Sequence, residues 1–202
     1  MEPQAAAAAM PWGELFGLLF MTMGPIRAIA TFSVVGEDDA APEVRALAGR
    51  AAALVAGAFV VTVVIGTGVL GAWGITFPVL IGAGGVALFA LSLQALLSPP
   101  AAGRRVNPAQ VEAAAIAFPG LFPPIAVVVP LIFAVAFPGL AVKLGILAMG
   151  LGIVALNWLL MLRAKAILRA IGPVPLQLLG AVFGVLQVAL ALQFIRDAVA
   201  MM

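Results

Sequence analysis

Six stretches of the chain are long and apolar enough to cross a lipid bilayer as helices. A helical span needs about 20 mostly apolar residues. We predict spans at residues 12–35, 47–70, 76–98, 113–137, 140–162 and 175–198. Of the 202 residues, 65% are hydrophobic and 9% are charged, whereas a soluble domain has about 25% charged residues. The sequence therefore predicts an all-α membrane protein that forms a single transmembrane domain over residues 1–202.

The composition also excludes several kinds of chemistry. Cysteine and histidine are absent, which removes disulfides, the usual zinc ligands and the commonest general base. The sequence has no pair of carboxylates, no nucleophile beside a base and no glycine-rich phosphate loop in an aqueous segment. Its few basic residues form no cluster suited to nucleic acid. We expect no catalytic residues, no metal site, no cofactor and no nucleic-acid partner.

The basic residues in the loops predict the orientation in the membrane. Cytoplasmic loops carry an excess of Lys and Arg. The loops after the first, third and fifth spans hold seven of these residues and the opposite side holds two. The seven are Arg45, Arg50, Arg104, Arg105, Arg163, Lys165 and Arg169, and the two are Lys143 and Arg196. The odd-numbered loops should therefore lie in the cytoplasm, with both termini outside it.

A helix-breaking segment occurs in the first span and again 99 residues later in the fourth. Residues 20–27 read FMTMGPIR, and residues 119–126 read PGLFPPIA. Proline removes a backbone donor and clashes with the preceding turn, so each segment should interrupt its helix. Inside a membrane, freed backbone groups are tolerated only where protein or a water-filled cavity satisfies them. Two broken helices at matching positions are typical of the substrate site of a transporter.

The same offset relates the two halves of the chain beyond these prolines. Between residues 80–94 and the segment 99 positions later there are 7 identities in 15 positions, where roughly one or two are expected by chance. Residues 12–98 form the first predicted repeat and residues 113–198 the second. Each repeat has three spans, an odd number, so the second should be inserted upside down relative to the first.

Several short motifs make the chain resemble the MarC family of bacterial inner-membrane proteins, which is also treated as a family of neutral amino acid transporters. The motifs are Gly24-Pro25 with Phe32, Gly74-Ile75-Thr76-Phe77-Pro78, Ala83-Gly84-Gly85, Ala117-Phe118-Pro119, Pro123-Pro124 and Gln193-Phe194-Ile195. The resemblance covers nearly the whole chain. It implies a multi-pass protein of the bacterial inner membrane with a transporter-like fold.

The chain departs from the family pattern in the segments expected to contact substrate. The acidic or amide residue before the first proline is Gly24, and the glycine that follows it in many members is Ile26. The second Gly-Pro-Gly of the family reads Pro123-Pro124-Ile125, and Arg27 follows the first break. The resemblance therefore implies the architecture more strongly than it implies the same cargo.

Arg27 lies well inside the first span, where an arginine costs about 2.5–3.5 kcal/mol on insertion scales. One explanation is a carboxylate of the cargo, held by Arg27 and by the positive end of the half-helix that starts after Pro25. The other is that Arg27 extends to the cytoplasmic headgroups or donates to the loose carbonyls at the break. The sequence slightly favours the second explanation.

The break in the fourth span carries no charge, but its prolines leave carbonyls without their usual donors. Such carbonyls can coordinate a cation or the ammonium group of a substrate, although a kinked helix repaired by a neighbour would have the same sequence. The predicted substrate-binding residues are Gly24, Pro25, Ile26, Arg27, Pro119, Gly120, Phe122, Pro123 and Pro124.

Polar side chains within the spans are candidates for the lining of a cavity, although each is more often an interhelical hydrogen-bonding group. We select Thr22, Thr31, Gln94 and Asn157. No Asp or Glu lies deep in a span, and proton-coupled transporters usually have such groups. Coupling to sodium ions through carbonyls, or uncoupled facilitation, fits the residues better.

The sequence thus predicts alternating-access transport of a small polar solute, a neutral amino acid. The partners expected are this solute, the lipid bilayer and a sodium ion. Two other classes stay open at this point. A passive pore would need a continuous polar lining and would give flux that does not saturate. A membrane scaffold or accessory protein would bind no amino acid, and the departures from the family motifs favour this class somewhat.

Overall fold

The computed structural model describes residues 10–35, 41–97, 107 and 111–202. Helices make up 87% of these residues, and this part of the chain has no strand. Five helical segments, one of them Trp12–Ser33, are long and apolar enough to span a membrane, and a bent pair of helices makes six if it counts as one span. The prediction of an all-α membrane protein is confirmed. The central residues of the two longest polar loops, 36–40 and 98–106, lie outside the described part.

The described part of the chain contains ten helical segments. The first half contains α2 (Trp12–Met23), α3 (Pro25–Ser33), α4 (Pro42–Ala72) and α5 (Phe77–Leu97). The second half contains α6 (Ala113–Ile116), the wider π-helical turn η2 (Ala117–Leu121), α7 (Ile125–Ala136), α8 (Leu140–Met161), α9 (Ala164–Ile171) and α10 (Pro173–Met201).

Helix α4 begins five residues before the predicted span, at Pro42 rather than at residue 47. Proline is tolerated at the first helical position because its missing N–H would have no partner there. Glu43 in the first turn adds a favourable charge at the helix N-terminus. The helix therefore starts in the polar segment before the apolar stretch, and hydropathy alone does not detect this first turn.

The basic segment after the fifth span was predicted as a loop, but it forms the short helix α9. Arg163 precedes this helix, and Lys165 and Arg169 lie within it. The Nζ of Lys165 donates to the carbonyl of Val35, 2.6 Å away, and α9 packs against α3. This contact holds α9 against the end of the first span. Tertiary packing therefore stabilises a helix in a segment that is as rich in basic residues as a cytoplasmic loop.

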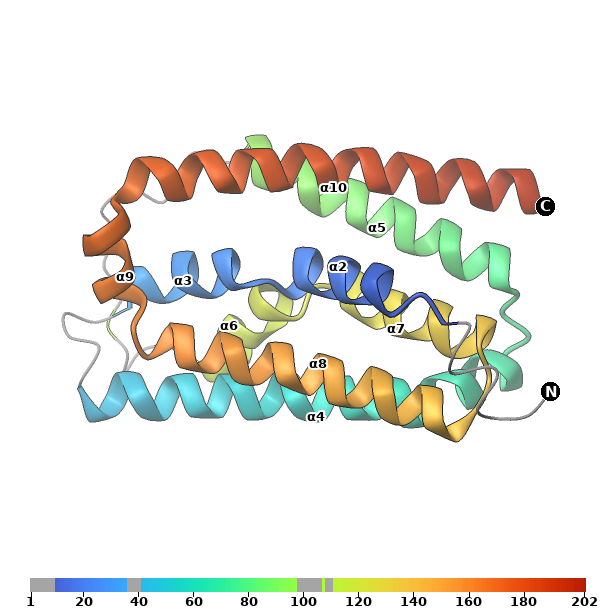
Figure 1. Ribbon diagram of the computed structural model, residues 1–202, viewed down its shortest axis with the longest axis horizontal. Helices are drawn as coiled ribbons and strands as arrows, with labels where there is room; N and C mark the ends of the chain where they lie inside the picture. The colour runs from blue at the N-terminus through green and yellow to red at the C-terminus, as the bar shows by residue number, and fades with distance from the viewer. Residues whose placement is uncertain (1–9, 36–40, 98–106, 108–110) are drawn as a thin grey trace.

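The helices form a bundle in which the halves of the chain pack against each other (Figure 1). Helices α5 and α10 run along one side, α4 and α8 along the opposite side, and α2, α3, α6 and α7 lie between them. The start of α4, the end of α3 and α9 lie at one end of the bundle, and the start of α2 and the end of α10 lie at the other (Figure 1).

Close approach between helices depends on small residues at their contacts. A Cβ added at Gly150 in α8 would overlap the ring of Phe59 in α4. Phe59 is fully buried. Lipid supplies no hydrophobic drive between spans, so such dispersion contacts are what hold them together. The core thus lies at the contact between the halves, around the interrupted segments.

Candidate functional site

Helices α2 and α3 meet at Gly24, and we call this junction the first interruption. Helix α2 ends at Met23 and α3 begins at Pro25, with Gly24 in extended conformation between them. Pro25 has no N–H to donate to the carbonyl of Met21, one turn before it. A Cβ at Gly24 would overlap the carbonyl oxygen of Phe20. Glycine is therefore the residue that lets the backbone turn this closely upon itself.

Side chains from the second half of the chain satisfy the carbonyls at this interruption. Gln187 in α10 donates through Nε2 to the carbonyl of Met21 at 2.7 Å, and Asn157 in α8 donates through Nδ2 to the carbonyl of Met23. The Nη2 of Arg27 donates to Oε1 of Gln187 at 3.3 Å. We call Arg27, Asn157 and Gln187 the polar cluster. It joins three helices at a point where backbone groups lack helical partners.

One atom of the polar cluster has no hydrogen-bond partner in the described part of the chain. Asn157 is 3% exposed, and its Oδ1 is buried without a donor nearby. A buried acceptor without a partner costs about 1–3 kcal/mol. The oxygen is therefore a place where an N–H group, a water molecule or a cation would be stabilised.

The second interruption lies between η2 and α7. The segments Ala113–Leu121 and Ile125–Ala136 meet at an angle of 56°. Phe122 and Pro123 in the bend are buried, whereas Pro119 and Pro124 are exposed and Gly120 is partly exposed. The ring of Phe122 packs edge-on against Phe59 at 6.5 Å and against Phe118 at 5.8 Å between centroids. Phe122 in this bend thus contacts two aromatic rings, whereas the first interruption has polar side chains beside it.

The segments around the two interruptions are neighbours in the fold. Helix α2 packs against α7, and α3 packs against η2. All four lie in the middle layer of the bundle (Figure 1). The structure therefore brings the residues around Gly24 and Pro25 into the same region as those around Phe122 and Pro123.

The other predicted residues have different environments. Thr22 is fully buried, but its hydroxyl donates to the carbonyl of Leu18 in its own helix at 2.8 Å. Thr31 and Ile26 are partly buried in α3. Gln94 is exposed near the end of α5. Of the four polar side chains predicted to line a cavity, Asn157 is the one whose amide reaches an interruption.

Gln187 is one of the polar side chains within the spans but not one of the four selected above, although it contacts both Arg27 and the freed Met21 carbonyl. The offset of 99 pairs it with Leu88, so the repeat gives no sign of a polar role. Two features of the sequence could have indicated Gln187. Arg27 needs a partner inside the membrane, and Gln187 is an amide in the middle of an apolar span.

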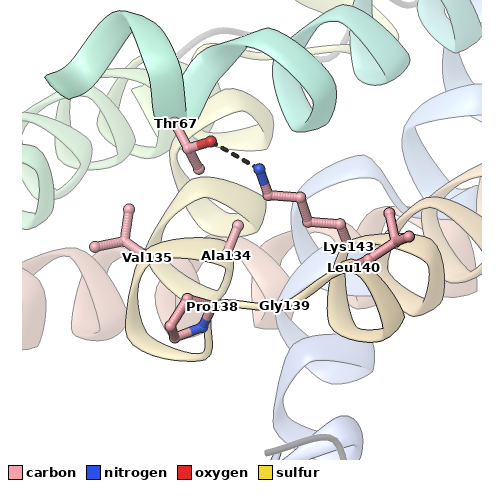
Figure 2. A pocket seen from close by; sticks show the side chains of 7 residues that line it. All are labelled: Thr67, Ala134, Val135, Pro138, Gly139, Leu140 and Lys143. Atoms are coloured by element: carbon pink, nitrogen blue, oxygen red, sulfur yellow. Dashed lines mark hydrogen bonds between the residues drawn. The ribbon is translucent and has the colours of Figure 1, made fainter. Parts of the chain in front are cut away.

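A cavity of about 470 Å³ lies elsewhere, between α4 and the turn that joins α7 to α8. None of the predicted site residues lines it. Figure 2 shows the ammonium group of Lys143 beside the hydroxyl of Thr67 in this cavity. In the described residues no group of three or more acidic side chains could hold a metal ion.

Comparison with known proteins agrees with the architecture. Residues 11–202 match the model of the family described as MarC family integral membrane protein. No curated protein and no solved structure matches the chain significantly. The family match covers almost the whole sequence, including both interrupted segments and the polar cluster. The chain therefore belongs to the MarC family of integral membrane proteins.

Proposed function

We propose that this protein is a transporter that moves a small polar solute, a neutral amino acid, by alternating access around the two interruptions. The polar cluster is the observation that carries the proposal. It places an arginine and two amides beside backbone carbonyls that a continuous helix would use internally. Polar groups deep in a membrane protein are costly and mark substrate or ion pathways.

The chemistry of the cluster suits a zwitterion. Arg27 and the positive end of α3 favour a carboxylate. The free Oδ1 of Asn157 and the backbone carbonyls at the break favour an ammonium group. A neutral amino acid carries one group of each kind, and the apolar surroundings of Phe122 suit a side chain without charge.

An inverted repeat is part of the proposal, and the contact pattern of the helices supports it. Corresponding helices contact each other: α4 with α8 and α5 with α10. Contacts between other helices also occur in pairs, since α3 packs against α8 and its counterpart α7 packs against α4. A two-fold axis between the repeats would relate the contact of α3 with α8 to the contact of α7 with α4.

Individual residues at the contact of α5 with α10 follow the same rule. Gly85 packs against Ile195, and Gly184 packs against Leu96. The offset of 99 relates Gly85 to Gly184 and Leu96 to Ile195. Exchanging the two repeats therefore converts one contact into the other. The likeness between residues 80–94 and the last span would then reflect a shared packing role.

We place the protein in the bacterial inner membrane with both termini outside the cytoplasm. The described basic residues at the start of α4 and around α9 belong to one end of the bundle, opposite the start of α2 and the end of α10 (Figure 1). The positive-inside rule assigns that end to the cytoplasm. The cluster contains no carboxylate, so sodium, coordinated by the carbonyl and amide oxygens at the break, is the coupling ion we propose over a proton.

Thermal unfolding of the purified protein in detergent, with a panel of amino acids and with or without sodium, tests this function. We expect at least one neutral amino acid to raise the unfolding midpoint, because a ligand that binds only the folded state stabilises it. Asn157→Leu should abolish that rise, and Gln94→Leu, at an exposed position, should retain it. Equal rises in both variants, or no rise with any amino acid, would contradict the proposal and favour an accessory protein.

A further inference from the structure

We propose that the cavity between α4 and the α7–α8 turn binds the phosphate group of an anionic glycerophospholipid. The cavity is lined by Thr67, Ala134, Val135, Pro138, Gly139, Leu140 and Lys143 (Figure 2). It contains none of the residues at the two interruptions, so this inference does not depend on the proposed transport function.

The turn that forms one wall of the cavity is built for a sharp change of direction. Helix α7 ends at Ala136, Pro138 follows, and α8 begins at Leu140. Gly139 between them has φ 156° and ψ 149°, a region of backbone space that is almost restricted to glycine. The turn brings the first residues of α8 beside the last part of α4, where Thr67 lies.

Lys143 gives the cavity an unbalanced positive charge. It lies in the first turn of α8, where the helix dipole is positive and a cation is unfavourable. Its Nζ donates to Oγ1 of Thr67 at 3.0 Å, and it has no carboxylate partner in the described chain. An ammonium group has three donors, so two are free for an anion in the cavity.

The start of α8 adds backbone donors to the same place. The N-cap is Gly139, which has no side chain to accept hydrogen bonds from the first turn. The first N–H groups of a helix need acceptors from outside the helix. Phosphate oxygens are suited to such a terminus, and the neighbouring Lys143 would add its charge to the same group.

The surroundings indicate a lipid rather than a free anion. Val135, Pro138 and Leu140 give the cavity an apolar rim, and Leu140 is 74% exposed. Trp73, just beyond the end of α4, is 76% exposed. Exposed tryptophans are enriched at the membrane–water interface, where headgroups lie. A phospholipid would place its phosphate beside Lys143 and its acyl chains along the apolar rim.

Thermal unfolding in detergent with added phosphatidylglycerol tests this site. The comparison uses Lys143→Met, which removes the charge, Lys143→Arg, which keeps it, and Arg196→Met, which removes an exposed charge on α10. Val135→Trp fills the cavity and leaves Lys143 in place. One basic residue contributes about 1 kcal/mol near an anionic surface, so Lys143→Met should raise the half-saturating lipid concentration about fivefold.

We expect Lys143→Arg and Arg196→Met to respond to the lipid like the unaltered protein, and Val135→Trp to lose the response. If Lys143→Met does not fold, Val135→Trp decides the question alone. An unchanged lipid response in both Lys143→Met and Val135→Trp would overturn the inference. So would equal stabilisation by free glycerol phosphate, which would make the cavity a site for soluble anions.

Discussion

The side-chain amide of Asn157 in α8 donates a hydrogen bond to the backbone carbonyl of Met23, the last residue of α2. The two residues are 134 positions apart and come from different halves of the chain. The interruption at Gly24 therefore depends on a side chain from the second half. If α8 moves relative to α2, either this bond breaks or the residues around Gly24 move together with α8. In the proposed alternating-access cycle, this bond would couple the site to the movement of the helices.

Asn157→Leu should destabilise the protein, because it leaves the carbonyl of Met23 buried without a donor. We expect a loss of about 1–2 kcal/mol in the free energy of unfolding. Thr62→Val is the matched control, since the Thr62 hydroxyl bonds only to the carbonyl of Ala58 in its own helix. The control should change stability by less than about 0.5 kcal/mol. Unfolding in mixed micelles measures both, and equal losses would contradict the role given to Asn157.

Gly24→Ala and Gly120→Ala should differ strongly, although both glycines lie in interrupted segments. A Cβ at Gly24 overlaps the Phe20 carbonyl, which is backbone and cannot move aside easily. A Cβ at Gly120 meets nothing within 4 Å. We expect Gly24→Ala to lose about 2 kcal/mol or more of stability and Gly120→Ala to stay within about 0.5 kcal/mol. A neutral Gly24→Ala in the same unfolding assay would show that the backbone turn there is not required.

Arg27→Ala should weaken binding of an amino acid while leaving the fold intact. Arg27 reaches Gln187 at 3.3 Å, and Gln187 keeps its shorter bond to the Met21 carbonyl without it. Loss of a charge-assisted contact to a carboxylate corresponds to about a 10–100-fold weaker affinity. Isothermal titration measures the affinity and circular dichroism the helix content. If Arg27→Ala binds the amino acid with unaltered affinity, Arg27 only supports the packing around the first interruption through its bond to Gln187.

Gly85→Ala should be more harmful than Gly184→Ala. A Cβ at Gly85 would lie 3.0 Å from both the Ala191 carbonyl oxygen and the Ile195 nitrogen, which are backbone atoms. A Cβ at Gly184 would meet the end of the Leu96 side chain at 2.8 Å, and that side chain is partly exposed and can rotate. We expect a loss of about 1–3 kcal/mol for the first and less than about 1 kcal/mol for the second.

Gly180→Ala is the reference variant, because a Cβ at this position in α10 meets no atom within 4 Å. It measures the effect of replacing a helical glycine where no contact is made. If Gly85→Ala matches this reference in the unfolding assay, α5 and α10 do not pack as closely as the structure indicates.

The fold could be predicted from the sequence because the lipid environment leaves few choices. Apolar stretches of span length must form helices in a bilayer. For this reason the limits of α8, Leu140 and Met161, lie within one residue of the predicted span 140–162. The bounds of α4 and the existence of α9 could not be predicted in this way. Both depend on helix capping or tertiary contact in polar flanks, where hydropathy carries no information.

The site could be predicted only in part. Gly24 and Pro25, which the sequence predicts as helix-breaking, lie where α2 ends and α3 begins, since proline and glycine act on the backbone wherever they occur. The sequence could not select Gln187 or reject Gln94 as a partner of the first interruption, because both are single amides in apolar spans. Which amide points inward depends on the rotation of each helix, and helices that are apolar on all sides have no periodic signal to fix it.

Uptake into proteoliposomes, measured as the initial rate against the concentration of a neutral amino acid, distinguishes a transporter from a pore and from an accessory protein. For the proposed transporter we expect a rate that saturates and that falls when a second neutral amino acid competes. The rate should be lost in Gly24→Ala and kept in Gly180→Ala, where a Cβ meets nothing within 4 Å. A rate that rises in proportion to concentration would indicate a pore. A rate equal to that of empty liposomes for every amino acid would contradict transport by this protein.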